Sequence, residues 1–201
     1  MPEQGSITYA LCTDLSGAAA AAVRYLWQNL EARYGLRAAQ TTEKPHVTFS
    51  VFNAALEQEA ELLEALAAAA IRVEPFSLFL DGLSSMSGEN RQEVFIRVVK
   101  GDETEVAFNT IWRTILDLGV MVRQDYHPGA WSPRCVLAGN DLKPERLQTV
   151  RHYLRTQVVS WRSATKTMSL YRVTPGGLEL AGTWALGEEA PAVNVSYFAQ
   201  Q

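Results

Sequence analysis

The chain has 201 residues, with 22 acidic and 18 basic side chains and a formal net charge of −4. This length supplies an ample core for one large domain or two small ones, and the charge balance excludes an overall polycationic surface for duplex nucleic acid. The start of the chain lacks the pattern of a secretory signal, and the longest apolar stretches are far too short to span a bilayer. We therefore expect a globular, cytoplasmic protein without a membrane segment.

The first half of the chain predicts three strands that alternate with two helices. Ser16 is placed to cap a long helix and Gly35 to end it, and the apolar residues of this helix fall on one face. The strands are expected at residues 7–13, 46–52 and 76–83, and the helices at residues 17–34 and 56–71.

The second half repeats this order after a polar, turn-rich segment at residues 84–92, which we interpret as a loop. Pro144 suits the first turn of a helix, and residues 175–177 suit a tight turn. Strands are expected at residues 94–99, 134–138, 164–173 and 178–186, and helices at residues 102–118 and 144–156. The segment after Glu188 is expected to be a loosely held tail.

The two halves are related by an offset of 88 residues. The offset takes Ile7 to Phe95, His46 to Arg134, and Phe76 to Ala164. The repeat is one of pattern, because few side chains are identical, and a chance alignment of two mixed segments is the alternative. It predicts a single two-lobed α+β domain over residues 1–201, with repeats at about residues 5–88 and 89–187 and a tail at residues 188–201.

Two short segments at this offset carry the functional interest. Residues 44–50 read Lys-Pro-His-Val-Thr-Phe-Ser, and residues 132–138 read Ser-Pro-Arg-Cys-Val-Leu-Ala. Because side chains alternate along a strand, His46 and Thr48 point to the same side. An imidazole can move a proton near neutral pH, and a hydroxyl can donate a hydrogen bond to a phosphoryl oxygen. A surface or core histidine without chemistry is the alternative interpretation.

These motifs resemble the two-histidine (2H) phosphoesterase superfamily, which includes LigT-like 2'-5' RNA ligases and 2',3'-cyclic nucleotide phosphodiesterases. That family has two strands of the form Pro-His-x-(Thr/Ser)-apolar, one in each half of a duplicated fold. Residues 168–172 and 178–186 also look like its closing hairpin. The resemblance implies antiparallel sheets flanked by helices around a central cleft, with His46 and Thr48 as catalytic residues.

The second motif departs from the family at both functional positions, which are Arg134 and Val136 here. A guanidinium does not release its proton in a working cycle, so Arg134 cannot be a general base. It is well shaped to hold a phosphate through two parallel hydrogen bonds. General acid or base help is worth about 10²–10⁴ in rate. The replacement therefore predicts a weak or altered phosphodiesterase that still binds phosphate through Arg134 and Thr48.

Other polar and aromatic residues are candidates for lining the cleft. Three of them lie in the loop before residue 134, and the offset of 88 pairs Tyr9 with Arg97. The alternative for the loop is a solvated segment with Trp131 buried in the core. The alternative for the pair is a polar end to an edge strand. The candidates are His127, Tyr126, Trp131, Tyr9, Arg97 and Tyr171. Tyr171 and Arg172 face opposite sides of their strand, so only one of them is expected at the cleft. Trp131 would offer a stacking face for a base.

The sequence predicts no metal and no cofactor. It has no Gly-rich phosphate loop and no cluster of His, Cys and carboxylates at ligand spacing. Cys12 and Cys135 are expected as reduced thiols in strands, with a single disulfide as the alternative.

Three functions remain open on this evidence. The first is an enzyme, expected as a monomer, that acts on a cyclic or 2'-5' phosphodiester of a nucleotide or RNA end. The second is a non-catalytic protein that binds a nucleotide or RNA phosphate in the same cleft. The third is a fold that serves protein contacts. Fold alone does not decide among them.

Overall fold

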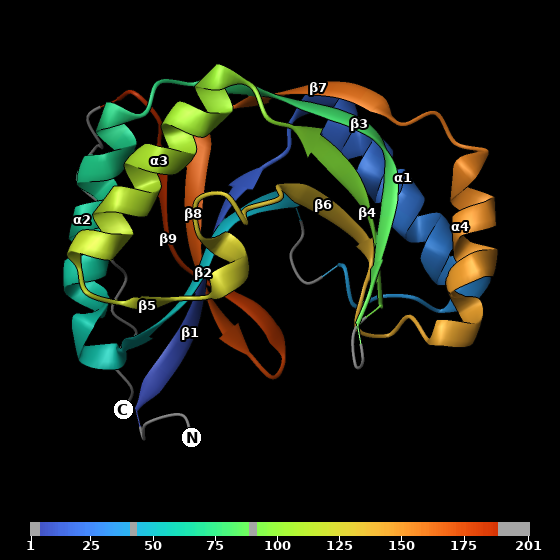
Figure 1. The fold of residues 1–201 in the computed structure, drawn as a ribbon, viewed down its shortest axis with the longest axis horizontal. Coiled ribbons are helices and arrows are strands. Elements are labelled where there is room, and N and C mark those ends of the chain that lie inside the picture. The colour runs from blue at the N-terminus through green and yellow to red at the C-terminus, as the bar shows by residue number, and fades with distance from the viewer. Residues whose placement is uncertain (1–4, 41–43, 89–91, 189–201) are drawn as a thin grey trace, which may run out of the picture.

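The computed structural model describes residues 5–40, 44–88 and 92–188, which form two antiparallel sheets and four α-helices (Figure 1). The first sheet has the order β5-β2-β1-β8-β9 and the second β6-β4-β3-β7. The elements are β1 (Ser6–Asp14), α1 (Gly17–Tyr34), β2 (His46–Ala55), η1 (Leu56–Gln58), α2 (Glu59–Arg72), β3 (Phe76–Ser87), β4 (Gln92–Val99), α3 (Asp102–Asp117), β5 (Met121–Val122), η2 (Gln124–Tyr126), β6 (Arg134–Ala138), η3 (Pro144–Arg146), α4 (Leu147–Arg155), β7 (Ser160–Thr165), β8 (Thr167–Thr174) and β9 (Gly177–Ala185).

The predicted helices and strands are present, with two differences. The segment expected as a loop at residues 84–92 is the end of a hairpin, because β3 and β4 stay paired as far as Ser87 and Gln92; residues 89–91 lie outside the described part. The strand expected at residues 164–173 is two strands, β7 and β8, which part at Lys166 and enter different sheets. The tail at residues 189–201 also lies outside the described part.

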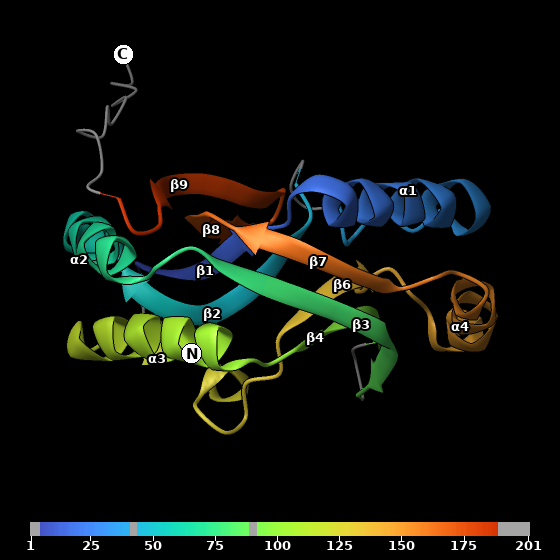
Figure 2. The ribbon, with the colours of Figure 1, turned by 90° about the horizontal axis from the view of Figure 1, so that it is seen from above.

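Each sheet draws strands from both halves of the sequence. β8 and β9 complete the sheet of β1 and β2, whereas β3 joins the sheet of β4, β6 and β7. The helices separate in the same way: α2 and α3 lie together against the first sheet, and α1 and α4 pack on the second (Figures 1 and 2). The order β2-β1-β8-β9 therefore matches the order β6-β4-β3-β7.

Cross-strand partners show which residues correspond between the sheets. His46 lies opposite Asp14 on β1, and Arg134 lies opposite Arg97 on β4. The offset is thus 88 from β2 to β6 (134 − 46) but 83 from β1 to β4 (97 − 14). The predicted correspondence of Tyr9 with Arg97 is wrong, because the linking segments differ in length.

One hydrophobic core runs through both sheets and joins residues from all four helices. Cys12 and Cys135 are buried free thiols in β1 and β6. No helix in the described ranges is long and apolar enough to cross a membrane. The core leaves β2 and β6 in contact although they belong to different sheets, and this contact positions the site.

Candidate active site

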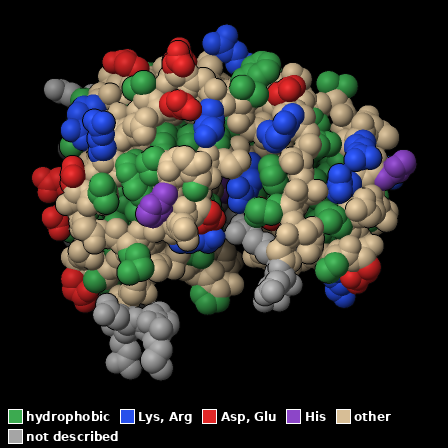
Figure 3. All heavy atoms as spheres, in the orientation of Figure 1, with side chains coloured by type: hydrophobic (Ala, Val, Ile, Leu, Met, Phe, Trp, Pro, Cys, Tyr) green, Lys and Arg blue, Asp and Glu red, His purple; other side chains and the backbone are tan. Residues whose placement is uncertain are grey.

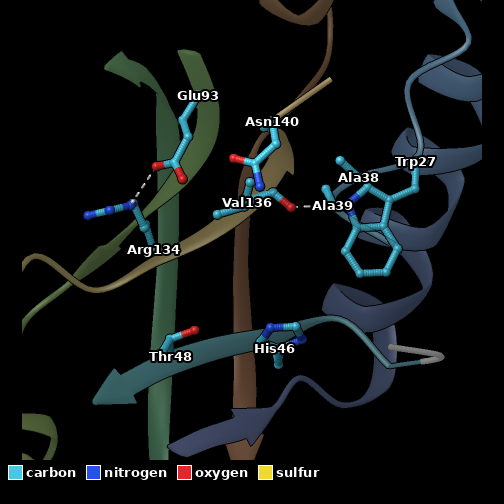
Figure 4. Close-up of a pocket in the computed structure, with 10 residues that line it drawn as sticks. Trp27, Ala38, Ala39, His46, Thr48, Glu93, Arg134, Val136 and Asn140 are labelled. Carbon is cyan, nitrogen blue, oxygen red and sulfur yellow. Dashed lines mark hydrogen bonds and ion pairs between the residues drawn. The ribbon is translucent and has the colours of Figure 1, made fainter. Parts of the chain in front are cut away.

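A pocket of about 150 Å³ opens between β2 and β6 (Figure 4). β2 supplies one side of the pocket, β6 with Glu93 of β4 supplies the opposite side, and α1 with the segment after it supplies the third. The lining residues are Trp27, Ala38, Ala39, His46, Thr48, Glu93, Arg134, Val136, Gly139 and Asn140. His46, Thr48 and Arg134, which come from separate halves of the sequence, therefore border one space.

Two tryptophans hold the facing strands in the same way. The indole Nε1 of Trp27 donates a hydrogen bond to the carbonyl oxygen of Val136 at 3.1 Å, and Nε1 of Trp131 donates to the carbonyl oxygen of Thr48 at 3.4 Å. Val136 and Thr48 are equivalent under the offset of 88. Each half of the chain thus holds the functional strand of the other half.

His46 is the first residue of β2, and its side chain enters the pocket (Figure 4). Its Nδ1 lies 3.2 Å from the carbonyl oxygen of Lys44, which favours the neutral tautomer with the proton on Nδ1. Burial lowers the pKa of His46, while the Lys44 carbonyl and the Asp14 carboxylate oppose the shift. The imidazole is therefore mainly neutral at pH 7.

Thr48 lines the pocket beside His46, and the buried Cys12 on β1 lies behind it. The Thr48 hydroxyl lies 3.7 Å from the Cys12 sulfur. Burial raises the pKa of the Cys12 thiol to about 12, so this sulfur stays uncharged. The Thr48 hydroxyl can therefore donate to a ligand without competition from a thiolate.

Arg134 occupies the opposite wall and is paired with a carboxylate. Its Nε lies 3.2 Å from Oε2 of Glu93, and its Nη1 donates to the carbonyl oxygen of Ser132 at 3.2 Å. The guanidinium carbon lies 5.3 Å from the centre of the Phe95 ring. The side chains of Arg134 and Glu93 are only 16% and 3% exposed. The pocket thus combines a guanidinium with a buried acid.

Sequence reasoning missed Glu93, Trp27 and Asn140. Glu93 lies one residue before the strand expected at residues 94–99, and Trp27 is one of the apolar residues that share a face of the helix expected at residues 17–34. Alternation along β4, which places Glu93 and Phe95 on the same side, is the signal that could have found the acid. Its pairing with Arg134 depends on the tertiary fold.

Two of the additional candidates lie near the pocket. The Tyr171 ring lies 6.4 Å from the His46 ring, centre to centre. Tyr126 packs on a small cluster that contains Cys12 and Tyr171. Burial raises the pKa of Tyr126 to about 12 although the Arg134 charge lowers it. Neither tyrosine lines the pocket itself.

Trp131 and His127 lie elsewhere. Trp131 is buried and stacks on Phe108 with ring centres 4.0 Å apart, so the predicted stacking face for a base is wrong and the core alternative is right. His127 packs on Trp112 at 4.8 Å, and its Nε2 lies 3.2 Å from the carbonyl oxygen of Val122. This position beside α3 keeps His127 out of the pocket, because η2 turns the loop away from it.

Tyr9 and Arg97 are also outside the pocket. Tyr9 is fully buried on the opposite face of β1, and its hydroxyl donates to Glu59 at 2.8 Å. Glu59 in turn pairs with Arg172, at 2.6 Å between Oε2 and Nε. Arg97 is exposed and lies against Gly82 of β3. The alternation of β1 and β8 explains the outcome, since it places Tyr171 near the cleft and Tyr9 with Arg172 on the core side.

Charged side chains are distributed unevenly between the helices at the two ends of the molecule. The acids of α2 and α3 are Glu59, Glu61, Glu64, Asp102, Glu103, Glu105 and Asp117, against Arg72 and Arg113. α4 carries Arg151, His152 and Arg155 and no acid. Figure 3 shows acidic side chains concentrated on the side of α2 and α3 and basic ones toward α4. No group of three or more His, Cys, Asp or Glu side chains that could hold a metal occurs among the described residues.

Two antiparallel sheets that each bring one strand to a shared polar pocket define a class of two-lobed, LigT-like proteins, and comparison with solved structures supports this assignment. Escherichia coli LigT complexed with 3'-AMP matches with a TM-score of 0.56 and 15% identity, over 92% of this chain and 99% of that chain. The protein TT0787 of Thermus thermophilus matches with a TM-score of 0.60 and 14% identity, over 92% and 100%. Usb1 of Kluyveromyces marxianus with uridine monophosphate gives 0.53 and 10%, over 92% and 100%.

The family model described as LigT like Phosphoesterase matches residues 14–96, a range that contains His46 and Thr48 but ends before β6. A search of curated protein sequences finds no match. The family-model match and the LigT-like fold over nearly the whole length of the chain support a relationship to the LigT-like 2H phosphoesterase superfamily. The predicted α+β LigT-like fold is confirmed.

Proposed function

We propose that the protein is a 2H phosphoesterase that acts on a cyclic or 2'-5' phosphodiester of a nucleotide or RNA end, with a rate reduced by the absence of a second histidine. The observation that carries the proposal is that His46, Thr48 and Arg134 line one pocket from two separate strands. The likeness to LigT with 3'-AMP and to Usb1 with uridine monophosphate supports a nucleotide phosphate as the ligand.

In this proposal Thr48 and Arg134 hold the phosphoryl oxygens, and His46 carries the proton. Charge-assisted bonds from a guanidinium are about twice as strong as neutral ones, so Arg134 supplies most of the phosphate affinity. A single imidazole accounts for about 10²–10⁴ of the rate.

Hydrolysis of 2',3'-cyclic nucleotides by the pure protein in EDTA tests the proposal. We expect turnover that falls about 10²–10⁴-fold in His46→Ala and a raised KM in Arg134→Ala. His127→Ala is the matched control, since this histidine lies outside the pocket, and its rate should equal that of the wild type. Saturable binding without turnover would instead assign a phosphate-binding protein, and equal rates for wild type and His46→Ala would refute the enzyme.

A further inference from the structure

A buried carboxylate in the pocket has no role in the function proposed above. Glu93 is 2% exposed, yet it lines the same pocket as His46 and Thr48. Figure 4 shows its carboxylate beside Arg134, on the wall opposite β2. An ionised group is costly to bury without a partner, so an acid at this position needs compensation.

Arg134 supplies this compensation and keeps capacity for a ligand. Its bonds use Nε, toward Glu93, and Nη1, toward the Ser132 carbonyl. A guanidinium has five N–H donors, and Nη2 has no hydrogen-bond partner among the residues that the structure describes. Arg134 can therefore hold the carboxylate and a phosphoryl oxygen together.

We propose that Glu93 replaces the missing second histidine as the acid–base partner of His46, a role that rests on the proposed phosphoesterase function. The Glu93 carboxylate takes a proton from the attacking water, and His46, in its protonated form, gives the Nε2 proton to the leaving ribose oxygen. A bond forms between phosphorus and the water oxygen, and the bond from phosphorus to the ribose oxygen breaks with its electron pair on that oxygen. Solvent then returns the proton from Glu93 to His46.

The surroundings of the two groups suit this direction of transfer. Five titratable groups lie around His46 in the described part of the chain: Asp14 opposite it on β1, Cys12 beside Thr48, Lys44 before it, Tyr171 on β8, and Cys135 on β6, whose thiol contacts the His46 backbone. Around Glu93 lie Arg134, with Arg97 further along the same face of β4 and Tyr126 near Arg134. The guanidinium balances the carboxylate, which leaves His46 as the group that carries the exchangeable proton.

This assignment fixes the sign of the pH dependence. Burial lowers the pKa of His46 from its ordinary value of 6.5. If protonated His46 is the donor, kcat rises as the pH falls from about 8 toward the lowered pKa. If His46 works alone as a base, kcat rises with pH over the same interval. The two mechanisms therefore predict opposite slopes.

The test combines this profile with Glu93→Gln, measured on 2',3'-cyclic nucleotides. We expect an acid-favoured wild-type profile, a loss in kcat of about 10²-fold or more in Glu93→Gln with little change in KM, and partial recovery in Glu93→Asp. Glu59→Gln is the matched control, because it removes a carboxylate that pairs with an arginine outside the pocket, and it should keep the wild-type profile.

Each result separates this inference from the function on which it rests. A Glu93→Gln rate within about threefold of wild type, or a wild-type rate that rises with pH, would overturn the role of Glu93 while leaving a His46-dependent enzyme. If Glu93→Gln does not fold, the slope of the wild-type profile alone decides. Absence of wild-type turnover at every pH would overturn both proposals.

Discussion

β2 and β6 occupy equivalent places in the two sheets but carry different chemistry. Each begins directly after a proline whose carbonyl oxygen accepts a backbone hydrogen bond near the end of the neighbouring strand, from Leu15 just after β1 to Pro45 at 2.7 Å and from Val98 in β4 to Pro133 at 3.1 Å. β2 keeps an imidazole and a hydroxyl, whereas β6 presents a guanidinium and a methyl-bearing side chain. The backbone arrangement of the two strands is thus the same although their side chains differ, and the pocket is kept when the functional side chains of one strand are replaced.

The largest effect is expected when the functional side chains of β2 are replaced by those of β6. The double variant His46→Arg/Thr48→Val leaves no imidazole in the pocket, so we expect phosphodiesterase activity to fall by about 10²–10⁴. Initial rates on a 2',3'-cyclic nucleotide measure the effect, and circular dichroism checks the fold. Retention of activity would mean that β2 does not supply the proton carrier.

Trp131 connects the segment before β6 to β2, and we expect its loss to affect the stability of the fold more than the catalytic rate. Trp131 stacks on Phe108 and donates to the Thr48 carbonyl, so Trp131→Ala should cost about 3–5 kcal/mol in the free energy of unfolding. Trp131→Phe keeps an aromatic ring and loses one hydrogen bond, worth about 0.5–1.5 kcal/mol. Urea unfolding compares the two. Equal losses would show that the hydrogen bond, rather than the stack, carries the stability.

The reverse conversion sharpens the comparison. Arg134→His/Val136→Thr gives β6 the same pair as β2, and a second imidazole titrates near neutral pH. If His46 has no acid–base partner in the wild type, kcat at pH 7.5 should rise by about 10²-fold, and KM should rise in either case, since the guanidinium that holds phosphate is lost. Steady-state kinetics measures both constants. A fall in kcat would show that the present pocket depends on the pair of Arg134 with Glu93.

The sequence predicted the parts of this site that depend on local pattern. Proline followed by alternating residues was sufficient to place His46, Thr48 and Arg134 on one side of two strands. The same alternation did not show that β7 and β8 part at Lys166, because a change of sheet leaves periodicity intact. It also did not reveal Glu93, whose meaning comes from a partner on another strand. Trp131 was ambiguous for a related reason, since an indole before a strand packs inward or outward according to tertiary contacts.

The smallest expected effect is on the pH dependence of the free energy of unfolding, which reports the burial of His46 independently of its role in catalysis. Because its folded pKa lies below 6.5, the unfolded chain binds more protons between these two values, and stability falls as the pH drops through that window. The slope from this group is at most about 1.4 kcal/mol per pH unit, and it levels off below the folded pKa. Above 6.5 the contribution is fully present.

His46→Gln should remove this slope, whereas His152→Gln, on the exposed face of α4, should leave it unchanged. Urea unfolding at several pH values between about 5 and 8 measures the difference between the variants. β6 offers the internal contrast, because Arg134 keeps its charge over this range and adds no slope of its own. If His46→Gln keeps the wild-type slope, the imidazole is solvated in the folded state, and the acid-favoured activity expected from its lowered pKa loses its physical basis.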